Sequence, residues 1–256
     1  MVELHVNLRE IAVFLAIMLR LSVVLFMMPV FTSIHYPNAA KIYTILALAC
    51  LVYLLPHGMI NPIPFEPAPL VKVVLWEVVF GLVMALAFPM IFGAFEFAGE
   101  MITFQMGFGF AQVADPQGGA QIMFLSGWFK LVSTLIFFSL NGHHVVLRAI
   151  MDSFHKIPIG GFVLDADIFG SIIGLSGQLF VIGIKIAAPI MVALLLTHVG
   201  MGILSKFAPQ VNILTASFPL TIMLGFIFMG ISVPIWAAAV ATYLGMMMKV
   251  LLRLGQ

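Results

Sequence analysis

The sequence has little charge, and this scarcity excludes most classes of soluble protein. Asp, Glu, Lys and Arg make up 8% of the 256 residues, whereas 63% of the residues are hydrophobic. Soluble domains carry roughly 25% charged residues, so the chain is not an ordinary soluble domain. The 11 basic and 10 acidic residues give a net charge of +1, which leaves no basic field to attract nucleic acid.

Patterns typical of enzymes and metal sites are also missing. The chain has a single cysteine and therefore no internal disulfide, and it contains neither a His-Glu-x-x-His zinc motif nor a nucleophile elbow. No phosphate-binding pattern follows Gly107 and Gly109. His143 and His144 are adjacent, and neighbouring side chains on a helix point about 100° apart rather than at one metal. We therefore expect no enzyme, no cofactor and no metal.

Long apolar runs fill most of the chain. They cover residues 11–30, 42–55, 70–94, 122–147, 168–204 and 211–252. A helix crosses the bilayer with about 20 apolar residues, so the second run is short for a straight crossing. At about 1.5 Å per residue, the last two would be roughly 50 and 60 Å long if continuous, against a hydrocarbon core of about 30 Å. We predict an all-α integral membrane protein.

Helix-breaking residues fall inside these runs. They are Pro89, Asn141 with Gly142, Pro189, Pro219 and Pro234. Broken helices at membrane depth need protein or water to satisfy the freed backbone groups, and overlong apolar helices expose hydrophobic surface unless other subunits cover it. We therefore expect long, broken helices within an obligate hetero-oligomer.

Small residues recur at helix-packing spacing. Gly170, Gly174 and Gly177 share one helical face, and such a face allows another backbone to approach closely. Packing within one helix hairpin and contact with another subunit are the two alternatives.

Charged residues inside an apolar run or just beyond its end are a sharper signal, because each costs about 2.5 to 3.5 kcal/mol at the bilayer centre. The candidates are Arg20, Lys72, Glu77, Glu96, Glu100 and Lys185. We expect buried charges at Arg20, Glu96, Glu100 and Lys185. Glu96 and Glu100 share a helical face, either at a solvated helix end or as a carboxylate pair beside a wet passage. For Lys185, a structural ion pair and a transport role are the alternatives.

The stretch MGFGFAQVADPQGGAQ, residues 106–121, interrupts the apolar pattern. Glycines provide backbone freedom, an Asp-Pro pair favours a turn, and two phenylalanines add bulk. Such a loop at membrane depth must be lined by protein or water. It could act as a movable stopper, and a surface connection between helices is the alternative. The candidate gating residues are Met106, Gly107, Phe108, Gly109, Phe110, Asp115, Pro116, Gly118 and Gly119.

Four segments of the chain resemble the FliR family of flagellar export-gate membrane proteins, whose injectisome counterpart is called SctT. AGEMITFQMGFGFAQVADPQGG resembles its glycine-containing segment ending in Asp-Pro and a glycine. LNGHHVVLRAIMDSFHKIPIG resembles its Asn-Gly-His-His helix followed by Ser-Phe and Pro-x-Gly, and APQVNILTASFPLTIMLGF its Pro-Gln-x-Asn loop with a downstream Phe-Pro. RLSVVLFMMPVFTSIHYPNAAKIYTILALA resembles its Arg-then-Pro pattern. The intact NGHH element favours the flagellar branch over the injectisome branch.

The resemblance implies a non-enzymatic subunit of a hetero-oligomeric gate in the bacterial inner membrane, at the flagellar basal body. One copy would assemble with several copies of FliP and FliQ, associate with FlhB, and help to form a helical spiral of hairpins around a closed channel. Residues 1–167 would resemble FliP, and residues 168–256 would resemble FliQ with a turn at SKFAPQVN. The expected inter-subunit residues of that turn are Lys206, Pro209, Gln210 and Asn212.

The family's channel-obstructing loop maps onto residues 106–121. By the resemblance, Phe108 and Phe110 would help to block the pore, the glycines would supply a hinge, and opening would let unfolded flagellar proteins pass. A secondary transporter that uses Glu96, Glu100 and Lys185 is the competing hypothesis. Inverted repeats would favour it, and the sequence shows no convincing internal repeat.

Overall fold

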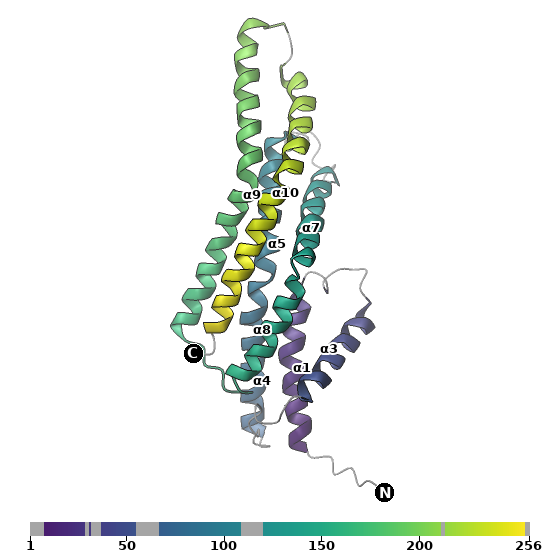
Figure 1. Cartoon of the computed structure of the whole chain (residues 1–256), viewed down its shortest axis with the longest axis vertical. Coiled ribbons are helices and arrows are strands. Elements are labelled where there is room, and N and C mark those ends of the chain that lie inside the picture. Colours follow the sequence, from purple (N-terminus) through teal and green to yellow (C-terminus); the bar gives the residue numbers. More distant parts are fainter. Residues whose placement is uncertain are drawn as a thin grey trace. The chain divides into compact units, whose positions relative to one another are not determined.

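The computed structural model describes residues 8–28, 31, 37–54, 67–108, 120–210 and 213–253, and every regular element in these ranges is a helix (Figure 1). The elements are α1 (Leu8–Met27), α3 (Asn38–Tyr53), α4 (Pro67–Ala87), α5 (Pro89–Gln105), α7 (Ala120–Ser139), α8 (Gly142–Lys156), α9 (Ala166–Phe207) and α10 (Ile213–Arg253). The predicted all-α class is confirmed.

The chain divides into two compact units that share the two long C-terminal helices. Unit 1 comprises Met1–Met90, Asn141–Leu175 and Leu244–Gln256, and unit 2 comprises Ile91–Leu140 and Ser176–Tyr243. The expected boundary between residues 167 and 168 falls at the start of α9, but neither unit ends there. Parts of α9 and α10 belong to each unit, because these helices pack on earlier helices as well as on each other.

Unit 1 is organised around α1. Its buried apolar residues recur three or four positions apart, at Val13, Ala16, Ile17, Leu21 and Val24, which is the spacing of a single helical face. This face brings α1 into contact with α4 and α3. Close approach to α4 depends on a glycine, because a Cβ built at residue 81 would lie 3.0 Å from the Cβ of Val23.

Unit 2 is organised around Trp236 of α10, which is fully buried. Its ring lies edge-on to Phe95 of α5 at 6.1 Å between centroids and tilted against Phe129 of α7 at 5.5 Å. The indole Nε1 donates a hydrogen bond to the carbonyl of Ile186 in α9 at 3.2 Å. One side chain therefore connects four helices, and it combines large apolar contact with a satisfied polar atom, as a buried tryptophan requires.

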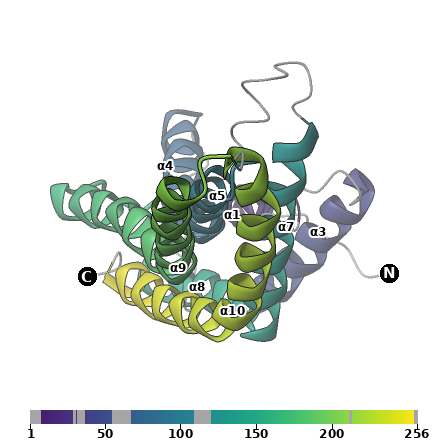
Figure 2. The same cartoon turned by 90° about the horizontal axis from the view of Figure 1, so that it is seen from above.

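Helices α9 and α10 form an antiparallel hairpin of unusual length (Figures 1 and 2). They contain 42 and 41 residues, so each is about 60 Å long. The expected breaks at Pro189, Pro219 and Pro234 are wrong, because all three prolines lie inside continuous helix. A proline removes one hydrogen bond, whereas ending a helix leaves four groups unpaired at each new end, so continuity is favoured in an apolar environment.

The other two expected breaks are confirmed. Pro89 is the first residue of α5, and Phe88 alone separates it from the end of α4 at Ala87. Proline is tolerated at a first helical position because its missing N–H would have no partner there. Asn141 separates α7 from α8 with a left-handed backbone at φ 55°, a conformation that asparagine tolerates better than most residues.

Among the described residues, four helical stretches are long and apolar enough to cross a membrane, and a fifth span results if α7 and α8 form one broken crossing. The four are Glu10–Met27, Pro67–Gln105, Ala166–Phe207 and Ala216–Leu251. Helix α3 has 16 residues and is short for a straight crossing, as its sequence indicates. The chain is an integral membrane protein.

Candidate functional site

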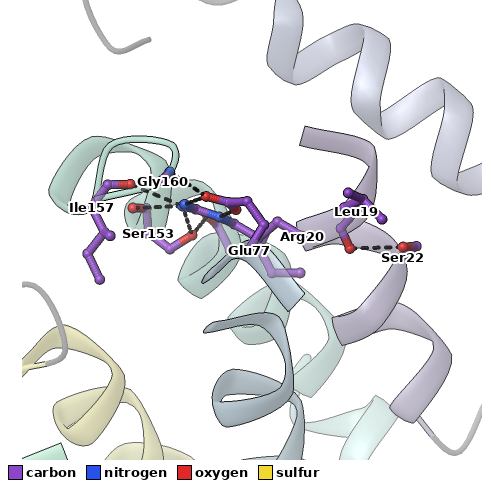
Figure 3. Close-up of polar contacts among 8 residues, drawn as sticks. Leu19, Arg20, Ser22, Glu77, Ser153, Ile157 and Gly160 are labelled. Atoms are coloured by element: carbon purple, nitrogen blue, oxygen red, sulfur yellow. Dashed lines mark hydrogen bonds and ion pairs between the residues drawn. The ribbon is translucent and has the colours of Figure 1, made fainter. Parts of the chain in front are cut away.

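A buried ion pair joins α1 and α4 within unit 1 (Figure 3). Arg20 of α1 and Glu77 of α4 are both fully buried. The guanidinium Nε donates to Glu77 Oε2 at 2.6 Å, and Nη2 donates to Oε1 at 2.8 Å. This two-point geometry matches the planar guanidinium to the carboxylate and is the strongest form of such a pair. It joins two segments that are each long and apolar enough to cross a membrane.

The remaining polar atoms of the pair are satisfied by the end of α8 and the turn that follows it (Figure 3). Arg20 Nη1 donates to the carbonyls of Ser153 at 3.3 Å and Ile157 at 3.2 Å, and the backbone N–H of Gly160 donates to Glu77 Oε1 at 2.9 Å. Backbone groups in the last turn of α8 and just beyond its end are thereby paired. The ion pair therefore ties three helices and a turn together.

Two aromatic rings enclose the guanidinium. The Cζ atom of Arg20 lies 4.6 Å from the ring centroid of Phe80 and 4.4 Å from that of Phe154. Both distances are within the roughly 6 Å range of a cation–π contact. The rings also exclude water, and this strengthens the electrostatic attraction to Glu77.

This cluster unites two sequence motifs that lie far apart in the chain. Arg20 belongs to the Arg-then-Pro pattern, and Ser153, Phe154 and Gly160 belong to the Ser-Phe and Pro-x-Gly elements. The sequence indicated that Arg20 would be buried, and the structure confirms it. The role of Glu77 as its partner was missed, although an opposite charge inside another apolar run was the available signal.

The other charges expected to be buried are exposed on this chain. Glu96 and Glu100 lie on exposed positions of α5, and Lys185 lies on an exposed position of α9. Within the described part of the chain, no ion pair joins any of the three to another residue. The expectation of burial is therefore not met within the chain itself, because the faces that carry these residues point away from the core of unit 2.

The first residues of the glycine-rich stretch pack against α10 within unit 2. Met106 is fully buried, and its carbonyl oxygen lies 3.1 Å from the hydroxyl oxygen of Thr221. Gly107 has φ 95°, and a Cβ at this position would lie 2.8 Å from Cε1 of Phe218. Phe108 follows with a half-buried side chain. Here the glycine motif meets the Phe-Pro element, a contact that the sequence did not predict.

The remaining candidates in this stretch lie outside the described residues. They are Gly109, Phe110, Asp115, Pro116, Gly118 and Gly119. In the second candidate loop, α9 ends at Phe207 and α10 begins at Ile213, so the hairpin turns where SKFAPQVN was expected to turn. Lys206, Pro209 and Gln210 are exposed, and Asn212 lies outside the described residues.

The described residues contain no group of three or more His, Cys, Asp or Glu side chains that could hold a metal ion. The rings of His143 and His144 lie together, with centroids 4.2 Å apart, rather than pointing apart as expected from helical spacing.

A cavity of about 850 Å³ lies beside the segment that connects α8 to α9, and its charged lining residues are Lys156, Asp165 and Asp167.

Comparison with known proteins defines the class of this chain. Residues 11–247 match the sequence profile of the family described as "Bacterial export proteins, family 1". The chain belongs to this family of export proteins. With its membrane-spanning helices, it is an integral protein of the bacterial inner membrane.

Individual relatives in this family are named FliR. The chain is similar to the flagellar biosynthetic protein FliR of Aquifex aeolicus, with 30% identity over 82% of this chain and 81% of that protein. It is 29% identical to the FliR of Pectobacterium carotovorum over 81% of this chain and 78% of that protein. The FliR of Escherichia coli is 27% identical over 86% of this chain and 84% of that protein. The resemblance to the FliR family is thus confirmed.

Proposed function

We propose that this chain is a channel-forming subunit of the flagellar type III export gate, which passes unfolded flagellar proteins across the inner membrane. One copy assembles with several copies of FliP and FliQ and associates with FlhB. Residues 106–121 help to close the channel, with Phe108 and Phe110 as blocking side chains. The chain contributes part of the channel wall and the loop that helps to close the channel, and it carries out no chemical reaction.

The observation that carries the proposal is the length of α9 and α10 together with their exposure. Each helix is about 60 Å long, twice the thickness of the hydrocarbon core. Large apolar side chains are nevertheless exposed along both helices, for example Leu196 at 66%, Phe207 at 82% and Ile231 at 65%. Lipid can cover only half of such a helix, so other protein subunits must cover the rest.

Glycine positions on the same helices support this interpretation. A Cβ built at Gly174 or Gly177 would meet no atom within 4 Å, and the same holds for Gly200, Gly202 and Gly230. The chain itself therefore does not use these close-approach sites. Of the two alternatives for the small-residue face, contact with another subunit fits this finding, and we extend the proposal to include it.

Native mass spectrometry of the chain co-expressed with its FliP and FliQ partners tests the proposal directly. We expect one copy of this chain in a complex with several copies of each partner. A lone monomer or homodimer, with both partners well expressed, would contradict the gate subunit and favour a secondary transporter.

Ion permeability tests the stopper. The double substitution Phe108→Ala with Phe110→Ala should raise ion leakage through the assembled gate, because the blocking bulk is removed while the backbone is kept. Unchanged leakage in a complex of normal composition would show that these side chains do not close the channel.

A further inference from the structure

The start of the glycine-rich stretch is held by three residues on one face of α10. Phe218, Thr221 and Gly225 are spaced three and four residues apart, so they lie on the same side of the helix. All three contact Met106 or Gly107. The contacts are of different kinds, so they define position more closely than a single contact would.

The polar contact fixes the backbone. Thr221 Oγ1 lies 3.1 Å from the carbonyl oxygen of Met106 and 3.0 Å from the carbonyl oxygen of Phe218, so its single hydroxyl proton is shared by the two acceptors. The Met106 carbonyl lies at the end of α5, where helix carbonyls lack intrahelical partners. Thr221 satisfies this group in a buried environment, where an unpaired carbonyl would be costly.

The two apolar contacts depend on glycines. A Cβ at Gly225 would lie 2.7 Å from Sδ and 2.9 Å from Cγ of Met106, so the methionine side chain occupies the space that any other residue would need. Gly107 has φ 95°, which disfavours residues with a Cβ, and its open side is filled by the ring of Phe218. In this structure Gly107 is therefore a packed turn rather than an open hinge.

We propose that Phe218, Thr221 and Gly225 are positioning residues for Phe108, so that α10 determines where this side chain stands in the channel. The inference rests on the proposed role of Phe108 as a blocking residue. Phe108 is two residues beyond the carbonyl that Thr221 holds and one residue beyond the turn that Phe218 fills. The chain therefore has little length in which to absorb a shift of this anchor before it reaches Phe108.

The test compares substitutions in the anchor with matched substitutions elsewhere in the chain, all in the gate assembled with FliP and FliQ. Thr221→Val keeps the shape and removes the hydroxyl, whereas Thr221→Ser keeps the hydroxyl. Gly225→Ala adds a Cβ that displaces Met106. The matched controls are Thr242→Val, whose hydroxyl bonds to its own helix at Ala238, and Gly127→Ala in α7, whose Cβ would meet no atom within 4 Å.

We expect Thr221→Val and Gly225→Ala to raise ion leakage severalfold, while native mass spectrometry shows unchanged subunit composition. Thr221→Ser and both controls should leak as the unsubstituted gate does. If Phe108→Ala leaks but neither anchor variant does, the contacts are ordinary packing and the inference is overturned. If Phe108→Ala itself does not leak, the blocking role fails and the inference fails with it.

A cross-link tests the contact without reference to leakage. In a Cys50→Ser background, Met106→Cys with Gly225→Cys should form a disulfide on mild oxidation of the assembled gate, because a Cβ built at residue 225 would lie 2.9 Å from Cγ of Met106. Met106→Cys with Gly230→Cys is the matched control and should not cross-link. Absence of the Met106–Gly225 cross-link in an intact complex would overturn the anchor, whatever the permeability of the gate.

Discussion

At the scale of single residues, Arg20 and Glu77 show how two buried charges can hold helices together once they are paired. Each alone would cost several kcal/mol inside an apolar environment. Together they form a two-point ion pair, and the carbonyls of Ser153 and Ile157 and the N–H of Gly160 satisfy the remaining groups. The pair therefore holds α1 and α4 specifically to the end of α8. It does not resemble a proton path, because its polar atoms are already engaged in these hydrogen bonds.

Removing one partner should leave the other charge buried without compensation. Arg20→Met or Glu77→Met should each lower the free energy of unfolding by about 3 to 5 kcal/mol. The double substitution should cost less than the sum of the single substitutions, because the two residues are coupled. The measurement is the thermal unfolding midpoint of the purified complex in detergent.

Lys72→Met provides the control for this cycle. Lys72 is an exposed cation on the same helix as Glu77, so its replacement should change stability by no more than about 0.5 kcal/mol. Strictly additive effects of the Arg20 and Glu77 substitutions would contradict the ion pair.

At the scale of helices, α10 has two separate tasks in unit 2. Trp236 holds α5, α7 and α9 together, and the face with Thr221 holds the start of the glycine-rich stretch. Long apolar helices with interior prolines need such side-chain contacts, because backbone hydrogen bonds alone do not determine which helices become neighbours. The packing of α10 thus links the core of unit 2 to the proposed stopper.

A graded series at Trp236 tests the first task. Trp236→Ala removes the whole ring and should lower the free energy of unfolding by about 3 to 5 kcal/mol. Trp236→Phe keeps an aromatic ring and loses the hydrogen bond to Ile186, so it should cost about 1 to 2 kcal/mol. Thermal unfolding of the assembled complex measures both, and equal losses would show that ring packing is not the main contribution.

At the scale of the whole molecule, the chain itself leaves much of the apolar surface of its long helices uncovered. The chain forms two compact units, yet only 33% and 22% of the 18-residue apolar windows in α9 and α10 are buried within it. Open glycine faces lie on the same helices. These features are expected of a subunit whose folding is completed by assembly, and they agree with membership in a family of export proteins.

Glycine substitutions can separate assembly from folding. Gly174→Leu and Gly200→Leu should leave the amount of chain in the membrane unchanged but reduce recovery of the complex severalfold, because both positions face open space in the chain. Gly99→Leu should reduce the amount of chain itself, since a Cβ there would lie 2.7 Å from Phe129. Quantitative immunoblotting of membranes and of the purified complex measures the two quantities, and loss of the chain in all three variants would argue against open faces.

The presence of helices and their membrane-spanning character could be predicted from the sequence, because both depend on local composition. The six apolar runs correspond to the described helices or to helix pairs, and the breaks at Pro89 and Asn141 follow from backbone geometry that these residues impose. The three prolines within α9 and α10 were misjudged, because the apolar surroundings favour helix continuity more than one missing hydrogen bond opposes it.

By itself the sequence determined the class of protein, the helical segments and the scarcity of charge that makes Arg20 conspicuous. Only the tertiary structure decided that Arg20 meets Glu77, 57 residues away, and that Met106 meets Thr221, 115 residues away. The physical reason is that composition and periodicity act over a few helical turns, whereas the choice of partner depends on how distant faces pack. The same tertiary packing left Glu96, Glu100 and Lys185 exposed, although their sequence neighbourhoods are as apolar as that of Arg20.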